Sequence, residues 1–89
     1  MRFALGRVVA TPGALRAFEK AEQAPSVFLD RHVNGDWGDV PQEDKQENEF
    51  SLQNGLRIFS AYTTKAGEKI WVITEADRSA TTMLLPQEY

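Results

Sequence analysis

The sequence predicts an α+β fold of order β-α-α-α-β-β-β, with helices packed on one face of an antiparallel sheet of three to four strands. Two observations predict it. The stretch from Leu56 to Pro86 contains three short strand patterns joined by two tight connections. Ahead of that stretch, Pro12, Pro25 and Pro41 each stand where a helix can begin, because proline suits the first helical position. The 89 residues have room for a single domain, residues 1–89, with one core.

The N-terminal part of the chain predicts one strand and two helices. Phe3 to Ala10 is rich in Val, Leu and Phe, and we expect it to add a strand to an edge of the sheet. Thr11 can cap a helix that runs to about Glu22, with apolar residues at helical spacing. A second helix is expected over Ser26 to Val33. It stops at Asn34-Gly35, because both residues tolerate left-handed backbone angles.

Residues 41–53 predict a third helix that is mostly exposed to solvent. Its only large apolar residues are Phe50 and Leu52. Six of the seven charged residues from Asp36 to Glu49 are acidic, which leaves the rest of the chain slightly basic. An acidic helix of this kind can imitate a nucleic-acid backbone or bind a basic protein, and it can equally be a solvated face.

Three alternating segments make up the expected sheet: Leu56 to Thr63, Lys69 to Thr74, and Ala80 to Leu85. The middle segment is largely apolar on both of its faces, so we expect it to lie inside the sheet. Gly67 suits the positive φ of the hairpin loop before it. The residues assigned to the core are Ile58, Phe59, Ile70, Trp71, Val72, Ile73 and Leu84.

Composition excludes several classes of function. The net charge of −3 disfavours direct nucleic-acid binding. With no cysteine and one histidine, the chain cannot form a disulfide or a Cys- or multi-His metal site, and we expect no cofactor. Gly6 and Arg7 interrupt the apolar N-terminus, and no apolar run could span a membrane, so we expect a soluble cytoplasmic protein. Because the core is small, a homodimer would be a natural way to bury more surface.

The first polar cluster that could carry function is the turn from Glu75 to Thr82. Arg78 there could bind an anion or an acidic group of a partner. Alternatively, Asp77 and Ser79 bond local backbone amides, as such residues do in turns, and Arg78 pairs with a neighbouring carboxylate. The candidate binding residues in this turn are Glu75, Asp77, Arg78, Ser79 and Thr81.

The second cluster runs from His32 to Asp39. Imidazole titrates near pH 6.5, so His32 could serve in acid–base chemistry; it could also simply pack at the helix end. Trp37 could anchor the loop in the core or serve as an exposed binding anchor, since tryptophan is enriched in binding hot spots. We include Trp37 and Asp39 among the candidate binding residues, and we assign no catalytic residue.

Two motifs carry a resemblance that covers nearly the whole chain: GDWGD at Gly35 to Asp39, and WVITEADRSATT at Trp71 to Thr82. The chain resembles a family of small bacterial proteins of chromosomes, plasmids and other mobile elements. Some of these carry labels such as "plasmid-related protein" or "type I restriction subunit". The resemblance implies an accessory protein of a mobile element but no activity. The restriction label has no support, because the chain holds no methylation or nuclease motif.

These observations leave hypotheses from different classes. The leading one is a small non-enzymatic interaction protein that binds another protein or complex, for example as an inhibitor of a complex acting against foreign DNA. The alternative is a toxin-like ribonuclease or other hydrolase that uses His32 and the Glu75 to Arg78 turn, although such proteins are usually basic. A nucleotide-binding or other small-molecule module is the third, and the sequence lacks the glycine-rich phosphate loop that would support it.

Overall fold

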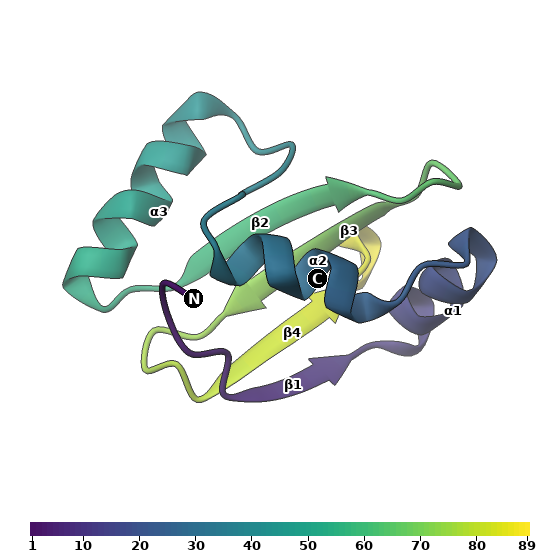
Figure 1. The fold of residues 1–89 in the computed structure, drawn as a ribbon, viewed down its shortest axis with the longest axis horizontal. Helices are drawn as coiled ribbons and strands as arrows, with labels where there is room; N and C mark the ends of the chain where they lie inside the picture. The colour runs from purple at the N-terminus through teal and green to yellow at the C-terminus, as the bar shows by residue number, and fades with distance from the viewer.

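Four strands form one sheet in the order β1-β4-β3-β2 in this computed structural model, which describes residues 1–89 (Figure 1). Strands β2, β3 and β4 form the expected antiparallel meander, and β3 lies inside the sheet as its pattern predicts. The strands are β1 (Arg7–Ala10), β2 (Ile58–Thr63), β3 (Lys69–Thr74) and β4 (Ala80–Leu84). The α+β class and the edge position of the first strand are therefore confirmed.

The prediction of an antiparallel sheet is wrong in one respect, because β1 runs parallel to β4. Arg7 lies opposite Ala80, and Ala10 lies opposite Met83. The sheet is therefore mixed. Sequence could not give this direction, since the alternation of side chains along a strand is the same beside a parallel or an antiparallel neighbour.

Three α-helices and one short 3₁₀ turn accompany the sheet: α1 (Pro12–Ala21), α2 (Pro25–Val33), α3 (Gln42–Asn54) and η1 (Pro86–Glu88). The expected cap of α1 is present, because the Thr11 hydroxyl accepts a hydrogen bond of 3.1 Å from the Ala14 amide. The turn η1 was not predicted from the sequence. None of the helices has the length and apolar character needed to cross a bilayer.

Helices α1 and α2 cover one face of the sheet, whereas α3 lies beside the edge strand β2 (Figure 1). This differs from the expectation that all helices pack on one face. The physical reason is the composition of α3, whose only buried residues are Asn48 and Ser51. Without an apolar stripe a helix gains little by lying on a core, so α3 remains largely exposed as predicted.

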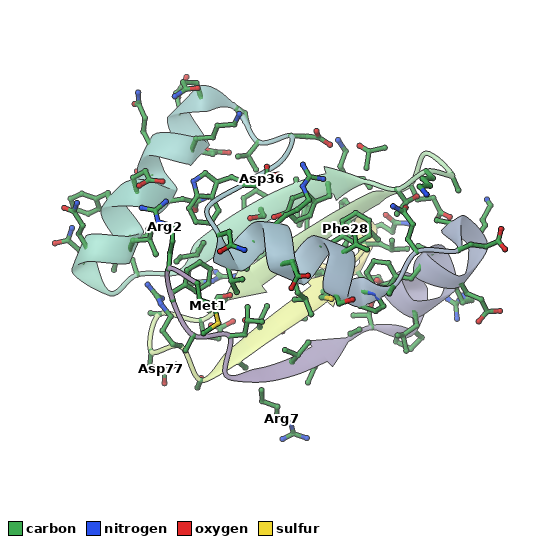
Figure 2. The ribbon with its side chains drawn as sticks, viewed as in Figure 1. Met1, Arg2, Arg7, Phe28, Asp36 and Asp77 are labelled. Carbon is green, nitrogen blue, oxygen red and sulfur yellow. The ribbon has the colours of Figure 1, made fainter.

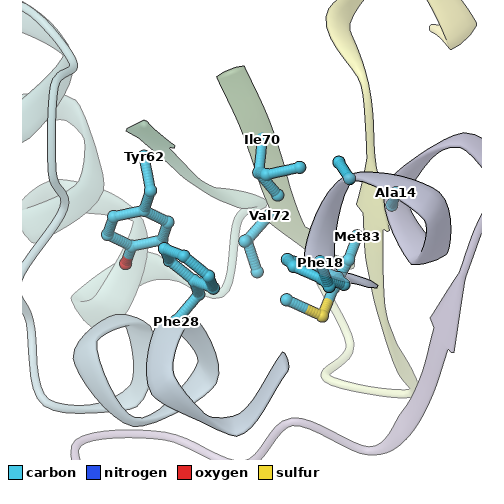
Figure 3. Close-up of a cluster of buried hydrophobic side chains, with 8 residues drawn as sticks. Ala14, Phe18, Phe28, Tyr62, Ile70, Val72 and Met83 are labelled. Atoms are coloured by element: carbon cyan, nitrogen blue, oxygen red, sulfur yellow. The ribbon is translucent and has the colours of Figure 1, made fainter. Parts of the chain in front are cut away.

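The main core lies between the sheet and helices α1 and α2 (Figure 3). At its centre Phe28 lies between Phe18, on which it stacks, and Tyr62, toward which it is tilted, with ring centroids 5.5 and 5.6 Å away. The Tyr62 hydroxyl donates a hydrogen bond of 2.6 Å to the Asp36 carbonyl, and burial raises its pKa to about 12. The eight residues of this core are Ala14, Ala17, Phe18, Phe28, Tyr62, Ile70, Val72 and Met83.

Two sets of hydrogen bonds satisfy the outward backbone groups of β2. The Asn48 side-chain amide donates to the Phe59 carbonyl at 2.7 Å, and its oxygen accepts from the Phe59 amide at 3.0 Å. Farther along, the Ala61 amide donates to the Trp37 carbonyl, and the Asp39 amide donates to the Ala61 carbonyl. The GDWGD motif therefore forms an isolated parallel β-bridge, Gly38 to Ala61, that protects this edge from other chains.

Candidate interaction surface

The sheet face opposite α1 and α2 carries no α-helix, although the short turn η1 lies against part of it. We call it the helix-free face. Side chains alternate along each strand, so the pairing register shows which residues share this face. One row across the sheet consists of Phe59, Ile73, Thr82 and Val9, and the next consists of Ala61, Trp71 and Leu84. The face is therefore largely apolar, although it faces outward.

Three aromatic rings form a line on the helix-free face. Trp71 makes edge-to-face contacts with Phe59 on one side, at 5.1 Å, and with Tyr89 on the other, at 5.7 Å. Tyr89 is 72% exposed, and the other two rings are partly exposed. A hollow of about 280 Å³ lies among these rings, with Ile73 and Arg57 completing its wall. Its size and lining suit one apolar or aromatic side chain.

Three basic residues lie on or beside the helix-free face. Arg7 and Lys69 lie on it by register, and Arg57 lines the hollow beside Tyr89, to whose hydroxyl it donates at 3.4 Å. A wider hollow of about 500 Å³ adjoins the first across Phe59 and Trp71. It reaches the ion pair of Lys69 with Asp39, whose nitrogen and oxygen are 3.6 Å apart. The hollow among the rings thus has a basic wall at Arg57, whereas the wider hollow is lined by Asp39 and Asp44 as well as by Lys69.

The two candidate residues of the GDWGD motif, Trp37 and Asp39, have different roles. Trp37 is only 4% exposed, stacks on Phe3 and donates its indole N–H to Glu49 at 3.2 Å. It therefore anchors the loop, and it is not an exposed binding anchor. Asp39 is exposed, accepts from the Thr63 hydroxyl and lines the wider hollow. Asp39 therefore borders the helix-free face.

The turn between β3 and β4 mostly satisfies its own polar groups. The exposed Asp77 carboxylate accepts from the Ser79 amide at 3.0 Å, and hydrogen bonds from Ser79 lower its pKa. The Ser79 carbonyl accepts from Arg7, while Thr81 is fully buried. Glu75 is exposed, and its charge acts on Arg57 at the end of the helix-free face. Of the seven candidate binding residues, Asp39 and Glu75 are the two that border this face.

Arg78 ties this turn to the end of α3. The backbone of Arg78 is left-handed, with φ +61°. Its guanidinium lies over the ring of Phe3. One nitrogen donates to the carbonyls of Leu56, Glu75 and Ala76 at 2.7 to 3.0 Å, and the other donates to Ser51 at 3.2 Å. These carbonyls belong to the negative end of α3 and to the turn. The guanidinium is thus engaged by the protein's own backbone.

We expect Arg78→Ala to lower the free energy of unfolding by about 2 kcal/mol, because four backbone carbonyls lose a charged donor. Arg78→Lys should lose less, since an ammonium keeps the charge but not the forked geometry. Urea denaturation of the three proteins measures this order. Unchanged stability in Arg78→Ala, together with lost partner binding, would instead make Arg78 a binding residue.

His32 lies at the start of a buried chain of hydrogen bonds that fixes its tautomer. Thr81 donates to the Leu5 carbonyl at 2.8 Å, so Thr74 must donate to Thr81 at 2.7 Å. Thr74 then accepts from His32 Nε2 at 2.9 Å, and Ser60 donates to Nδ1 at 2.6 Å. His32, Ser60, Thr74 and Thr81 are all 0% exposed.

This burial gives His32 no role with a substrate. Burial lowers its pKa to about 4, and both ring nitrogens are already engaged within the core. The geometry therefore does not favour the hydrolase hypothesis, which needs His32 to reach a substrate. No group of three or more His, Cys, Asp or Glu side chains is arranged to hold a metal ion.

Sequence reasoning missed the helix-free face because it assigned Phe59 and Trp71 to the core. A signal was present in the alternation. Arg57 precedes Phe59 by two residues, and Lys69 precedes Trp71 by two residues, so each aromatic shares its side of a strand with a charge. Comparisons of the chain with protein-family models, with curated proteins and with solved structures found no match. The resemblance to small mobile-element proteins stays a prediction.

Proposed function

We propose that this chain is a small non-enzymatic interaction protein that binds an acidic, apolar segment of another protein on its helix-free face. The observation that carries this proposal is the hollow among Phe59, Trp71 and Tyr89, which the chain itself does not fill. Aromatic side chains around a hollow are typical of binding hot spots. Arg57 at its wall favours a carboxylate in the partner.

One concrete version concerns the partner's identity. The mobile-element resemblance favours a bacterial complex that acts against foreign DNA, with this protein as its inhibitor or accessory. Expression of the protein should then reduce restriction of incoming phage or plasmid. Unaltered restriction would contradict this version, while leaving the binding surface to be tested by the variants below.

Trp71→Ala should weaken partner binding about thirtyfold or more, because it removes the central ring of the aromatic line. Arg57→Glu should weaken it about tenfold and reduce its sensitivity to salt, since it reverses the charge at the hollow. Affinity capture followed by titration of the captured partner measures both effects.

Val27→Ala is the matched control, because Val27 is an exposed apolar residue of α2, on the opposite side of the sheet. It should leave binding unchanged. Equal binding by the wild type, Trp71→Ala and Arg57→Glu would overturn the proposed surface. Binding of single-stranded oligonucleotides at physiological salt, lost in Trp71→Ala, would instead point to base stacking on the same rings.

A further inference from the structure

The two edges of the sheet differ in how their backbone groups are satisfied. Asn48 and the loop at Trp37 to Asp39 close the β2 edge. The other edge, β1, has β4 as its only neighbour (Figure 1). The Arg7 amide donates to the carbonyl of Ser79, just before β4, at 2.9 Å, and the Thr11 amide donates to the carbonyl of Met83 in β4 at 3.0 Å. Because amides alternate along a strand, those of Val8 and Ala10 point away from the sheet.

The open edge is also apolar. Val8 and Val9 are 43% and 38% exposed, and by register they lie on opposite faces of the sheet. No side chain or loop of the chain bonds the outward groups of Val8 and Ala10. The β1 edge contains no proline, and no side chain bonds its outward backbone groups as Asn48 does for β2. An edge of this kind is a template for another strand.

We propose that β1 pairs with β1 of a second copy of this chain, antiparallel about a two-fold axis through Val9. In this register Val8 lies opposite Ala10 of the second copy, and each pair exchanges two hydrogen bonds. All outward backbone groups of Val8 and Ala10 are then paired. Arg7 meets Thr11 of the second copy, so the arginines do not oppose one another.

The sequence around β1 selects this register over its neighbours. A shift of two residues toward α1 would oppose Val8 to Pro12, which has no amide hydrogen. A shift the other way would oppose Ala10 to Gly6, which lies outside the strand at φ +64°. Figure 2 shows the Arg7 side chain directed away from the body of the sheet at the start of this edge.

The proposed dimer has a continuous sheet of eight strands. Because the two-fold axis stands perpendicular to the sheet, both helical layers lie on one side and both helix-free faces lie on the other. The dimer thus presents two copies of that face side by side. This inference does not rest on the proposed function, since the edge pairs whether or not the face binds a partner.

Sedimentation velocity over a wide concentration range tests the dimer with the full chain. We expect the mass to rise from the 10.0 kDa of one chain toward twice that value. Val8→Pro should raise the dissociation constant about thirtyfold, because it deletes an outward amide in each copy but keeps the bonds that the Arg7 and Thr11 amides donate. Val8→Thr, which retains the amide and the branched side chain, should dimerise like the wild type.

Val9→Lys provides a second variant should Val8→Pro fail to fold, because it brings two like charges together at the axis. Hydrogen exchange supplies an independent readout, since the Val8 and Ala10 amides should gain protection as concentration rises. A wild-type chain that stays at the mass of one copy at the highest concentration would overturn the proposal. A dimer that persists unchanged in both Val8→Pro and Val9→Lys would also overturn it, because its interface would then lie elsewhere.

Discussion

Replacing Gly38 by alanine is expected to lower the free energy of unfolding by about 3 kcal/mol or more, one of the largest effects of any single-residue change in this protein. Gly38 lies in the loop that closes the β2 edge, at φ +75°, a conformation that alanine adopts only with strain. An added Cβ would also overlap the Ala61 carbonyl oxygen, and it would lie 2.6 Å from Cδ1 of Tyr62. Neither neighbour can retreat, because Ala61 is strand backbone and Tyr62 is 0% exposed.

Gly55→Ala is the matched control for this experiment. Gly55 ends α3 at φ +65°, so it carries a similar conformational cost, but nothing lies within 4 Å of the position of its Cβ. We expect this variant to lose about 1 kcal/mol, which is the cost of the left-handed backbone alone. Urea denaturation separates the two costs. Equal losses in the two variants would show that the loop at Gly38 can move away from β2.

The same glycine explains part of what the sequence could and could not predict. The GDWGD motif stood out in the sequence as a candidate for binding, but Gly38 is needed for its close approach to Ala61. The sequence allows two roles for Trp37, and the choice between them depends on Phe3, which comes from the distant N-terminal segment. A local pattern does not reveal such a long-range contact. A motif can therefore mark a tight packing requirement without marking a binding site.

Local signals predicted the helices and the meander well, whereas β1 begins at Arg7, four residues after the predicted start at Phe3, because Gly6 has a left-handed backbone. Lys69–Thr74 has the bounds that its alternation indicates, and the ends of α1 and α3 lie within one or two residues of their predicted positions. The parallel direction of β1 and the place of α3 were not predictable, because both depend on which surfaces meet in three dimensions. Alternation also indicates that Phe59 and Trp71 share a face with charged residues. It does not reveal whether an α-helix covers that face.

Acidification from about pH 6.5 to about pH 4 is expected to remove about 3 kcal/mol of stability through His32 alone. Burial lowers the pKa of folded His32 from 6.5 to about 4, since its ring is enclosed by Phe3 and Trp37 and bonded to Ser60 and Thr74. The unfolded chain therefore binds a proton across this range, and the folded chain does not. This contribution is fully present above pH 6.5 and is lost as the pH falls toward 4.

The prediction is specific because His32 is the single histidine of the chain. The carboxylates with lowered pKa values, among them Asp36 and Glu49, contribute stability that is lost only at lower pH, through their folded-state values. Urea denaturation at several pH values from about 7.5 to about 5.5, above the unfolded-state pKa values of the carboxylates, therefore isolates the imidazole. His32→Gln should be less stable at neutral pH, because it breaks the buried network, and its stability should hardly change over this range. A wild type whose stability stays flat over the same range would show that His32 is charged in the folded protein, and the neutral Nε2–H tautomer derived from Thr81 and Thr74 would then be wrong.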